Sequence, residues 1–509
     1  MKMLSLFSLF FLSLFHTLSA QPDIQRIDQY LSAARADWNI PGMSVAIVKD
    51  GEIVLSKGYG VIEAGTKNTV DENTLFAIAS NTKAFISAAI SSLVVEGKLD
   101  WDDRVRTYVP EFELYDEYVS NNATVRDLLS HRLGLGTFSG DFMWYKSDQT
   151  VPELITRLKY LQQAYPFRSG YGYSNLMFIT AGEVITRVTG KPWTDYIKES
   201  FFKTLEMDRT ITSTDDLSSK GNYAMPHKPY EDGNAVIPWV NWDNMGAAGG
   251  IISSANDMSN WMIMHLNNGV FSRDTVVHRN QQNIMWTIHN NHVISDKGKE
   301  QVPGRHFSGY GLGWGLGDYH GNMLVTHSGG YDGMYSRVML VPDQNLGIVI
   351  LTNSMKGIST PLCFYVVNEF IKKDQRDWSA EWLEKSRASS SEPGQIDKIK
   401  AAKVKKSKPT VALEKYTGKY WSGIHGNVVI SQTNKDQLKL EFENAQALSA
   451  TLRHWHYDTW EIIWDEPHAW FDFGLVQFQL DEKLDVKGLS FSVPNYDIFF
   501  DEVDLKRLK

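Results

Sequence analysis

The sequence predicts an α+β fold, with an antiparallel sheet flanked by helices and a helical subdomain, followed by a small C-terminal β-sandwich or barrel. Two regions rich in β-forming residues lie at 43–60 and 323–352, and the patterns between them are mostly helical. Strands at both ends of a segment with a helical middle indicate one α+β domain, whose sheet is completed when the two ends come together. A Ser- and Lys-rich stretch then separates a final segment of different composition.

These patterns divide the 509 residues into four parts. We expect a signal peptide at 1–20, a main domain at 21–384, a linker at 385–409 and a β-rich accessory domain at 410–509. The linker has few large apolar residues, as flexible connections do.

In the first half of the main domain, the sequence predicts a helix over 24–38 and then two strands joined at Asp50-Gly51. An Asp-Gly pair between two runs of β-forming residues is a strong hairpin signal. A buried, uncharged helix begins at Ser80 and ends at Gly97. Further helices are predicted at 125–131, 152–163, 176–189, 192–203 and 255–267.

The second half begins with a polar, His-rich segment at 270–308, which we interpret as an insertion or a lid. Together with 135–150, this segment is expected to form the walls of the binding pocket. Strands are predicted at 323–326, 336–341 and 346–352, with a last helix near 360–372. In the accessory domain, β-forming runs alternate with turn residues, which is typical of small sandwiches and barrels; they lie at 416–421, 427–431, 437–442, 459–464, 470–480 and 489–492.

The N-terminus indicates an exported protein, and the composition limits its partners. Met1-Lys2, a short apolar run and a small-residue end at Ala20 are typical of a secretory signal peptide, so we expect a secreted or periplasmic protein. After its removal, no membrane segment is expected. A net charge of −9 argues against nucleic acid or an anionic membrane as the main partner. The single cysteine, Cys363, allows no disulfide within the chain and is expected to be buried.

A serine and a lysine on one helix face form the first candidate catalytic motif. Ser80 and Lys83 are three residues apart, so their side chains lie on the same face of the predicted helix. A lysine that burial removes from water loses part of its preference for the charged form and can accept the serine proton. The same spacing at Ser200 and Lys203 lies in an ordinary amphipathic pattern and is interpreted as structural.

Two further motifs supply what an acyl transfer needs besides a nucleophile. Tyr173-Ser-Asn175 lies where a Gly-rich loop enters a helix. A phenol beside a cationic lysine has its charged form favoured, so Tyr173 is expected to act as a general base, while Asn175 contacts Lys83 and substrate. His327-Ser328-Gly329-Gly330 follows a predicted strand, whose amides can stabilise an oxyanion.

In this order along the chain, the three motifs resemble those of the serine β-lactamase and penicillin-binding protein superfamily. The sequence is most similar to the class C-like branch, which includes D-alanyl-D-alanine carboxypeptidases, D-aminopeptidases and esterases. The resemblance covers about 24–372 and implies a β-lactamase/transpeptidase-like fold. It implies that Ser80 is the nucleophile, Lys83 its proton partner, Tyr173 the base and Asn175 a substrate contact. The residues from His327 to Gly330 would then bind substrate, and the accessory domain resembles one appended to many exported relatives.

One departure from the family pattern affects the expected substrate. His327 stands where β-lactamases commonly carry a lysine, so a permanent cation that would hold a substrate carboxylate is missing. We therefore expect a peptidase-, carboxypeptidase- or esterase-like serine hydrolase that acts on amide or ester bonds. A class C-like β-lactamase and a non-catalytic ligand-binding or sensing module remain the alternatives.

Other residues that could carry chemistry are interpreted as structural. His131 is expected to satisfy nearby loop backbone. His289, His292, His454 and His456 lack carboxylate or cysteine partners at metal-binding spacing, so no metal or cofactor is expected. The tryptophans of the accessory domain are expected to form its core or, alternatively, a stacking surface for glycan; they are residues 421, 455, 460, 464 and 470.

Overall fold

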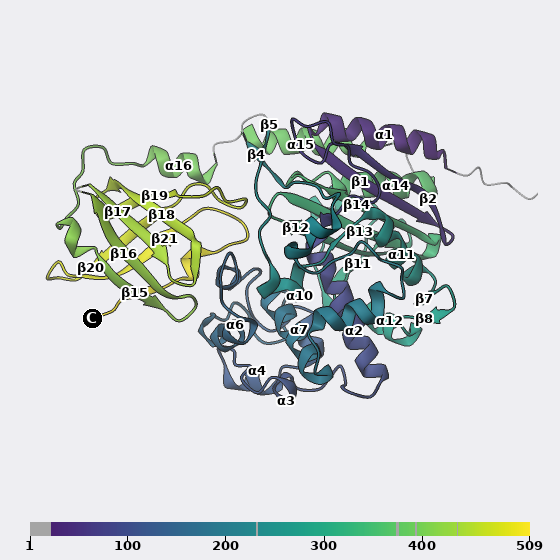
Figure 1. Ribbon diagram of the computed structural model, residues 1–509, viewed down its shortest axis with the longest axis horizontal. Helices are drawn as coiled ribbons and strands as arrows, with labels where there is room; N and C mark the ends of the chain where they lie inside the picture. The colour runs from purple at the N-terminus through teal and green to yellow at the C-terminus, as the bar shows by residue number, and fades with distance from the viewer. Residues whose placement is uncertain (1–21, 231–232, 373–375, 392–393, 435) are drawn as a thin grey trace, which may run out of the picture.

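A computed structural model describes residues 22–509, except 231–232, 373–375, 392–393 and 435. It contains a main α+β domain and a C-terminal β-barrel, which lie side by side in Figure 1. The predicted signal peptide falls outside the described residues. None of the helices in the described part of the chain combines the length and hydropathy needed to span a bilayer.

An eight-stranded antiparallel sheet forms the centre of the main domain, in the order β2-β1-β14-β13-β12-β11-β10-β9. The first and last segments meet as predicted, since β1 pairs with β14 and Val45 lies opposite Ile350. The hairpin between β1 and β2 turns at Asp50 and Gly51, both with positive φ. The strands are β1 (Gly42–Lys49), β2 (Glu52–Gly60), β9 (Asn290–Asn291), β10 (Ser308–Tyr310), β11 (Gly315–Tyr319), β12 (Asn322–Tyr331), β13 (Met334–Val341) and β14 (Leu346–Thr352).

Helices cover both faces of this sheet (Figure 1). On one face, α1 (Ile24–Asp37), α14 (Ser359–Ile371) and α15 (Trp378–Ser391) enclose an apolar cluster that includes Cys363. On the other, α11 (Ala255–Leu266) packs on β1 and β14, and α2 (Thr82–Val95) connects the sheet to the helical subdomain. The helix α2 is buried along nearly its whole length.

The helical subdomain is built from shorter elements around α2 and α7. Its helices are α3 (Val105–Tyr108), α4 (Glu117–Asn122), α5 (Val125–Leu129), α6 (Val151–Arg157), α7 (Asn175–Thr189), α8 (Trp193–Ile197) and α10 (Gly246–Gly249). Three further helices lie elsewhere in the main domain: α9 (Leu217–Lys220), α12 (Arg279–Met285) and α13 (Asp296–Gln301). Three short strand pairs complete the domain: β3 (Phe76–Ala77) with β6 (Ile252–Ser253), β4 (His227–Tyr230) with β5 (Gly233–Val236), and β7 (Val270–Phe271) with β8 (Asp274–Thr275).

The accessory domain is a closed eight-stranded antiparallel barrel, which decides between the predicted sandwich and barrel. Its strands alternate buried and exposed residues, and Tyr416, Tyr420 and Trp460 fill the interior. The strands are β15 (Gly418–Ser422), β16 (Gly426–Asn434), β17 (Gln437–Phe442), β18 (Ala445–His456), β19 (Thr459–Trp464), β20 (Leu475–Leu480), β21 (Val486–Ser492) and β22 (Leu505–Arg507). In the segment predicted as a linker, α15 runs past residue 384 and α16 (Gln395–Ala401) follows.

The barrel packs directly against the helical subdomain through Phe142. This fully buried ring lies 4.5 Å from the ring of Phe500, 4.9 Å from that of His425 and 5.3 Å from that of Phe442, measured between centroids. Beside it, the Gly140 N–H donates to Glu502 Oε2 at 2.7 Å. The segment around Phe142 is therefore enclosed between the helical subdomain and the barrel.

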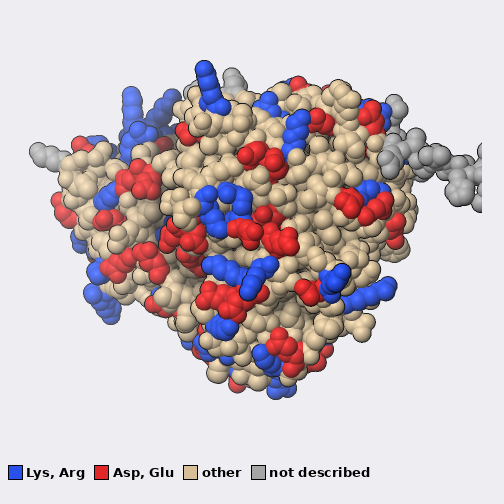
Figure 2. Space-filling model, turned by 45° about the vertical axis from the view of Figure 1, so that its right-hand side comes forward, with Lys and Arg blue, Asp and Glu red and all other residues tan. Residues whose placement is uncertain are grey.

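Acidic and basic side chains are interspersed over the face of the molecule drawn in Figure 2. Red and blue groups adjoin one another there. The net charge of −9 is thus not gathered into one single-sign area on this face.

Candidate active site

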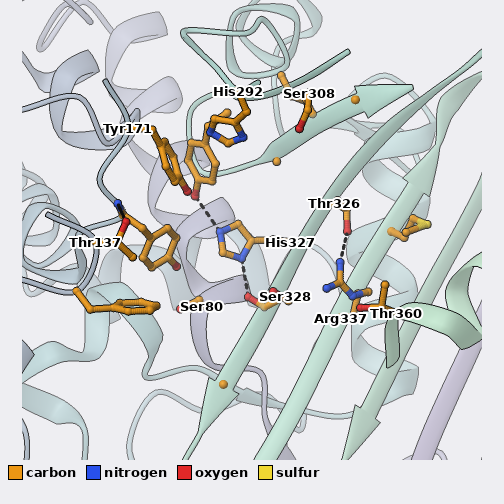
Figure 3. Close-up of a pocket in the computed structure, with 18 of the residues that line it drawn as sticks. Ser80, Thr137, Tyr171, His292, Ser308, Thr326, His327, Ser328, Arg337 and Thr360 are labelled. Atoms are coloured by element: carbon orange, nitrogen blue, oxygen red, sulfur yellow. Dashed lines mark hydrogen bonds between the residues drawn. The ribbon is translucent and has the colours of Figure 1, made fainter. Parts of the chain in front are cut away.

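A pocket of about 640 Å³ lies where β12 meets the helical subdomain (Figure 3). Its walls include Thr137, Phe138 and Trp144 from the segment 135–150, and His292, Arg305 and Ser308 from 270–308. Both predicted wall segments are thereby confirmed. Of the eight predicted site residues, Ser80, Tyr173, Asn175, His327, Ser328 and Gly330 line the pocket, and the other two, Lys83 and Gly329, are packed directly beside it.

Ser80 lies in a single 3₁₀ turn, Ala79–Asn81, that leads into α2. Ala79 has φ +47°, a left-handed conformation that non-glycine residues seldom adopt and that is found at functional sites. Strand β12 packs against this turn at Gly329, where a Cβ would lie only 2.2 Å from Ile78 O. The glycine therefore permits close contact between the strand and the backbone that carries Ser80.

Lys83 is completely buried and directed at Ser80. Its Nζ lies 3.0 Å from Ser80 Oγ, 2.7 Å from Asn175 Oδ1 and 2.7 Å from Ala248 O. Burial holds the pKa of the lysine well below its usual range. A neutral amine has two N–H groups, which the two carbonyl oxygens accept, and its lone pair is then left for the serine O–H. The site can therefore accept a proton from Ser80.

Asp141, which the sequence did not single out, supports this lysine through Asn175. The Asn175 Nδ2 donates to Asp141 Oδ2 at 2.7 Å, and the Trp144 indole donates to Oδ1 at 2.9 Å. Burial raises the pKa of Asp141 to about 8, so the low polarity of this region disfavours charge on both Asp141 and Lys83. Asn175, with one carbonyl oxygen and one amide group, links the two.

Tyr173 is positioned by backbone and aromatic contacts. Its own N–H donates to Thr137 Oγ1, and the Ser174 N–H donates to His131 Nδ1 at 3.0 Å. The His131 ring lies 4.3 Å from the Tyr173 ring, while Lys83 Nζ is 4.8 Å from the ring centroid. His131 thus satisfies loop backbone, as expected, and at the same time fixes Tyr173.

The protonation state expected for Tyr173 was wrong. Burial raises the pKa of its phenol well above the ordinary value, and the hydrogen bond with Ser80 offsets this only in part. The charged form is disfavoured because Lys83, itself buried, supplies no permanent positive charge. In the resting site the phenol therefore carries its proton, and Lys83 is the group suited to accept one.

His327 is a neutral residue of the pocket. Its Nδ1–H donates to Ser328 O at 2.7 Å, and its Nε2 accepts from the Tyr310 O–H at 2.8 Å, as the dashed lines in Figure 3 mark. Burial and Lys83 lower its pKa to about 3. His327 cannot replace a permanent cation, in agreement with the sequence-based expectation.

Arg337 of β13 supplies a cation elsewhere in the same pocket. Its guanidinium lies beyond His327 from Ser80, where it donates to Thr326 Oγ1 at 3.3 Å (Figure 3). Its Nε is buried without a hydrogen-bond partner, and burial lowers its pKa. Arg305, whose Nε is likewise unpartnered, lines this part of the pocket as well. An anionic group could therefore bind here.

Strand β12 presents an open edge to the pocket. It pairs with β11 only as far as Thr326, whereas on its other side it pairs with β13 up to Tyr331. In the described part of the chain, no other strand pairs with residues 327–331. An extended peptide can bind such an edge through its main chain.

Several contributions to the site were not predicted from the sequence. They include Asp141, the Ala248 carbonyl, the arginines Arg305 and Arg337, and the barrel residues Trp470, Asp497 and Ile498. A backbone carbonyl has no side-chain signature. Asp141 follows a loop glycine and precedes Phe142, which sequence alone does not distinguish from a turn residue. Trp470 was expected in the barrel core or on a glycan-binding surface, but it faces Gly330 of β12.

Comparisons with known proteins give matches to both domains of the chain. Residues 27–362 match the family model described as Beta-lactamase, and residues 402–507 match one described as a domain of unknown function, DUF3471. The chain is 30% identical over 413 residues to "Unguisins hydrolase ungD'" of Aspergillus campestris (strain IBT 28561), covering 77% of this chain and 75% of the relative. It is 30% identical over 344 residues to "Protein flp" of Staphylococcus aureus (strain N315), covering 65% and 63%.

Among solved structures, the chain resembles the octameric penicillin-binding protein homologue from Pyrococcus abyssi. The TM-score is 0.61 with 20% identity, over 95% of this chain and 99% of the other. At this level of identity the likeness shows a shared fold.

Proposed function

The chain belongs to the beta-lactamase family of serine hydrolases, and we propose that it is an exported enzyme that cleaves amide or ester bonds of small peptides through an acyl-enzyme on Ser80. The observation that carries this proposal is the placement of Lys83. Its buried amine faces Ser80 Oγ while two carbonyl oxygens accept its N–H groups. This is the arrangement that an activated serine nucleophile requires.

In the proposed reaction, Ser80 Oγ attacks the substrate carbonyl while its proton passes to Lys83 Nζ. The Ser80 N–H, in the 3₁₀ turn before α2, and an amide on the open edge of β12 stabilise the oxyanion. Tyr173 then gives its proton to the leaving amine or alcohol and regains one from Lys83. Water attacks the acyl-enzyme with the same groups acting in reverse, which releases the acid and restores Ser80.

Two features favour small peptides as substrates. The open edge of β12 suits an extended main chain, and Arg337 and Arg305 suit the carboxylate of a short peptide. The relative named as a hydrolase of unguisins supports hydrolysis as the chemistry. Since His327 is neutral, rapid β-lactam turnover is not expected, and a class C-like β-lactamase is the alternative outcome.

Intact-mass spectrometry with a fluorophosphonate and with penicillin tests this proposal, with Ser80→Ala beside the wild type. We expect one fluorophosphonate adduct on the wild type, absent from the variant, and slow formation of a penicillin adduct. Rapid destruction of penicillin that depends on Ser80 would instead establish a β-lactamase. A failure of the fluorophosphonate to label Ser80 would refute the acyl-enzyme. Export is tested by N-terminal sequencing of the protein recovered outside the cytoplasm, which we expect to start near Gln21.

A further inference from the structure

The barrel contributes a negatively charged side chain to the pocket of Ser80. Asp497, with Trp470 and Ile498, lines the same cavity of about 640 Å³. These residues belong to segments that flank β20 and β21, whereas every other residue of the wall belongs to the main domain. The accessory domain therefore completes the pocket.

The turn that carries Asp497 is held in one conformation by Asn495. The Asn495 Oδ1 accepts from Asp497 N–H at 3.0 Å and from Ile498 N–H at 2.7 Å, and its Nδ2 donates to Ile498 O at 2.7 Å. Ile498 is buried beside it, while Tyr496 points into solvent. This packing directs the Asp497 side chain into the pocket.

Asp497 differs from the other carboxyl groups nearby because, in the described part of the chain, its carboxylate accepts no hydrogen bond from a side chain. Asp332 accepts from Tyr145 and Trp242, and Asp141 accepts from Asn175 and Trp144. By contrast, burial and Asp332 raise the pKa of Asp497 to about 6, and no cation in the described part of the chain offsets them. A positively charged group of a ligand would favour the ionised form of the Asp497 carboxylate and so act against both the burial and the repulsion from Asp332.

The surroundings of Asp497 suit an ammonium group. Trp470 and Tyr335 lie over Gly330, where a Cβ would be 3.3 Å and 3.4 Å from their rings. The Tyr335 phenol interacts electrostatically with Asp497, and aromatic side chains attract cations. This part of the pocket adjoins Gly330, whereas Arg337 lies beside Thr326, so the two charged parts lie toward opposite ends of the exposed segment of β12.

We propose that Asp497, with Trp470 and Tyr335, forms a subsite for the ammonium group of the substrate, supplied by a free peptide N-terminus or by a lysine side chain. The inference rests on the proposed peptide hydrolysis and adds a substrate class to it. The barrel is then a specificity element: it selects cationic acyl donors, and the chemistry at Ser80 does not depend on its charge.

Calorimetric titration of the full-length Ser80→Ala variant tests binding without turnover. The ligands are alanyl-alanine amide, its N-acetyl derivative and N-acetyl-lysyl-alanine amide, each as L and D isomers. We expect the free N-terminal amine to bind at least tenfold more tightly than the acetylated dipeptide. Adding Asp497→Asn should remove this preference and leave the acetylated ligand unchanged. Tighter binding of the lysyl ligand alone would assign the subsite to a side chain.

The matched control is Asp501→Asn, which removes an exposed carboxylate from the same region of the barrel. It should leave every dissociation constant unchanged. The preference for the amine should also fall as the pH drops through about 6, where Asp497 takes up a proton. The groups that interact electrostatically with Asp497 are Asp332, Asp141, Tyr173 and Tyr335. Lys83 and Lys146 act on Asp141 and Asp332 respectively.

Equal binding of free and acetylated ligands, or an equal loss for both in Asp497→Asn, would overturn the subsite. Failure of the proposed function would look different, because it would appear as an unlabelled Ser80 in the fluorophosphonate experiment, whatever the ligand preference.

Discussion

Replacement of Tyr173 by phenylalanine separates the two roles that a phenol could have in this site. The ring contacts survive the change, because His131 lies 4.3 Å from the ring centroid, Phe138 5.5 Å and Lys83 Nζ 4.8 Å. Only the O–H is lost, together with its hydrogen bond to Ser80. We therefore expect the free energy of unfolding to change by no more than about 1 kcal/mol, the size of one net hydrogen bond.

The effect on catalysis should depend on the leaving group. Loss of a positioned general acid or base costs about 10²–10⁴ in rate, which corresponds to roughly 2.7–5.4 kcal/mol in the barrier. A peptide anilide needs a proton on its leaving nitrogen, so kcat/KM for it should fall by the full factor. A p-nitrophenyl ester leaves without a proton and should lose much less. Steady-state kinetics on both substrates provide the measurement.

Tyr171→Phe is the matched control, since Tyr171 lines the same pocket and its ring packs against His292 and Tyr310. It should change both rates only slightly. An equal fall for anilide and ester in Tyr173→Phe would refute leaving-group protonation. A fall confined to the ester would contradict the proton path altogether.

Three further predictions follow from the same geometry. Phe142→Ala should lower the free energy of unfolding in urea by about 3–5 kcal/mol, because it removes a fully buried ring from between the two domains. Tyr118→Ala, at an exposed position, is the control and should not have this effect. Equal stability of the two variants would contradict the packing of the barrel against Phe142. Gly329→Ala places a Cβ 2.2 Å from Ile78 O and should lower kcat/KM roughly 10²-fold by displacing Ser80. Gly357→Ala, at an uncrowded position, is its control. Normal activity of the Gly329 variant would contradict the close contact. Burial lowers the pKa of Lys83, and the neutral form of this lysine is the base. Therefore kcat/KM for an uncharged ester should rise with pH, with a midpoint well below the ordinary lysine pKa of about 10.4. A midpoint at the ordinary lysine pKa would contradict the assignment of Lys83 as the base.

Much of the fold could be predicted because its signals are local. The Asp50-Gly51 hairpin, the buried helix after Ser80 and the alternation of the C-terminal strands each come from a short stretch of sequence. The positions of Ser80, Lys83, Tyr173, Asn175 and His327 were predicted in the same way, because each lies in a motif of three or four residues. The closure of the last strands into a barrel could not be predicted from a short stretch of sequence, because it depends on the pairing of β15 with β22, the first and last strands of that domain.

The sequence by itself determined which reactive groups the chain carries and which of them share a helix face or a strand. Only the tertiary structure decided their protonation, since the pKa values of Lys83, Tyr173 and Asp141 depend on burial by residues from distant segments. It also decided that Asp497, from the far end of the chain, enters the pocket of Ser80. The physical reason is that charge preference and proximity arise from desolvation and packing, which no short stretch of sequence contains.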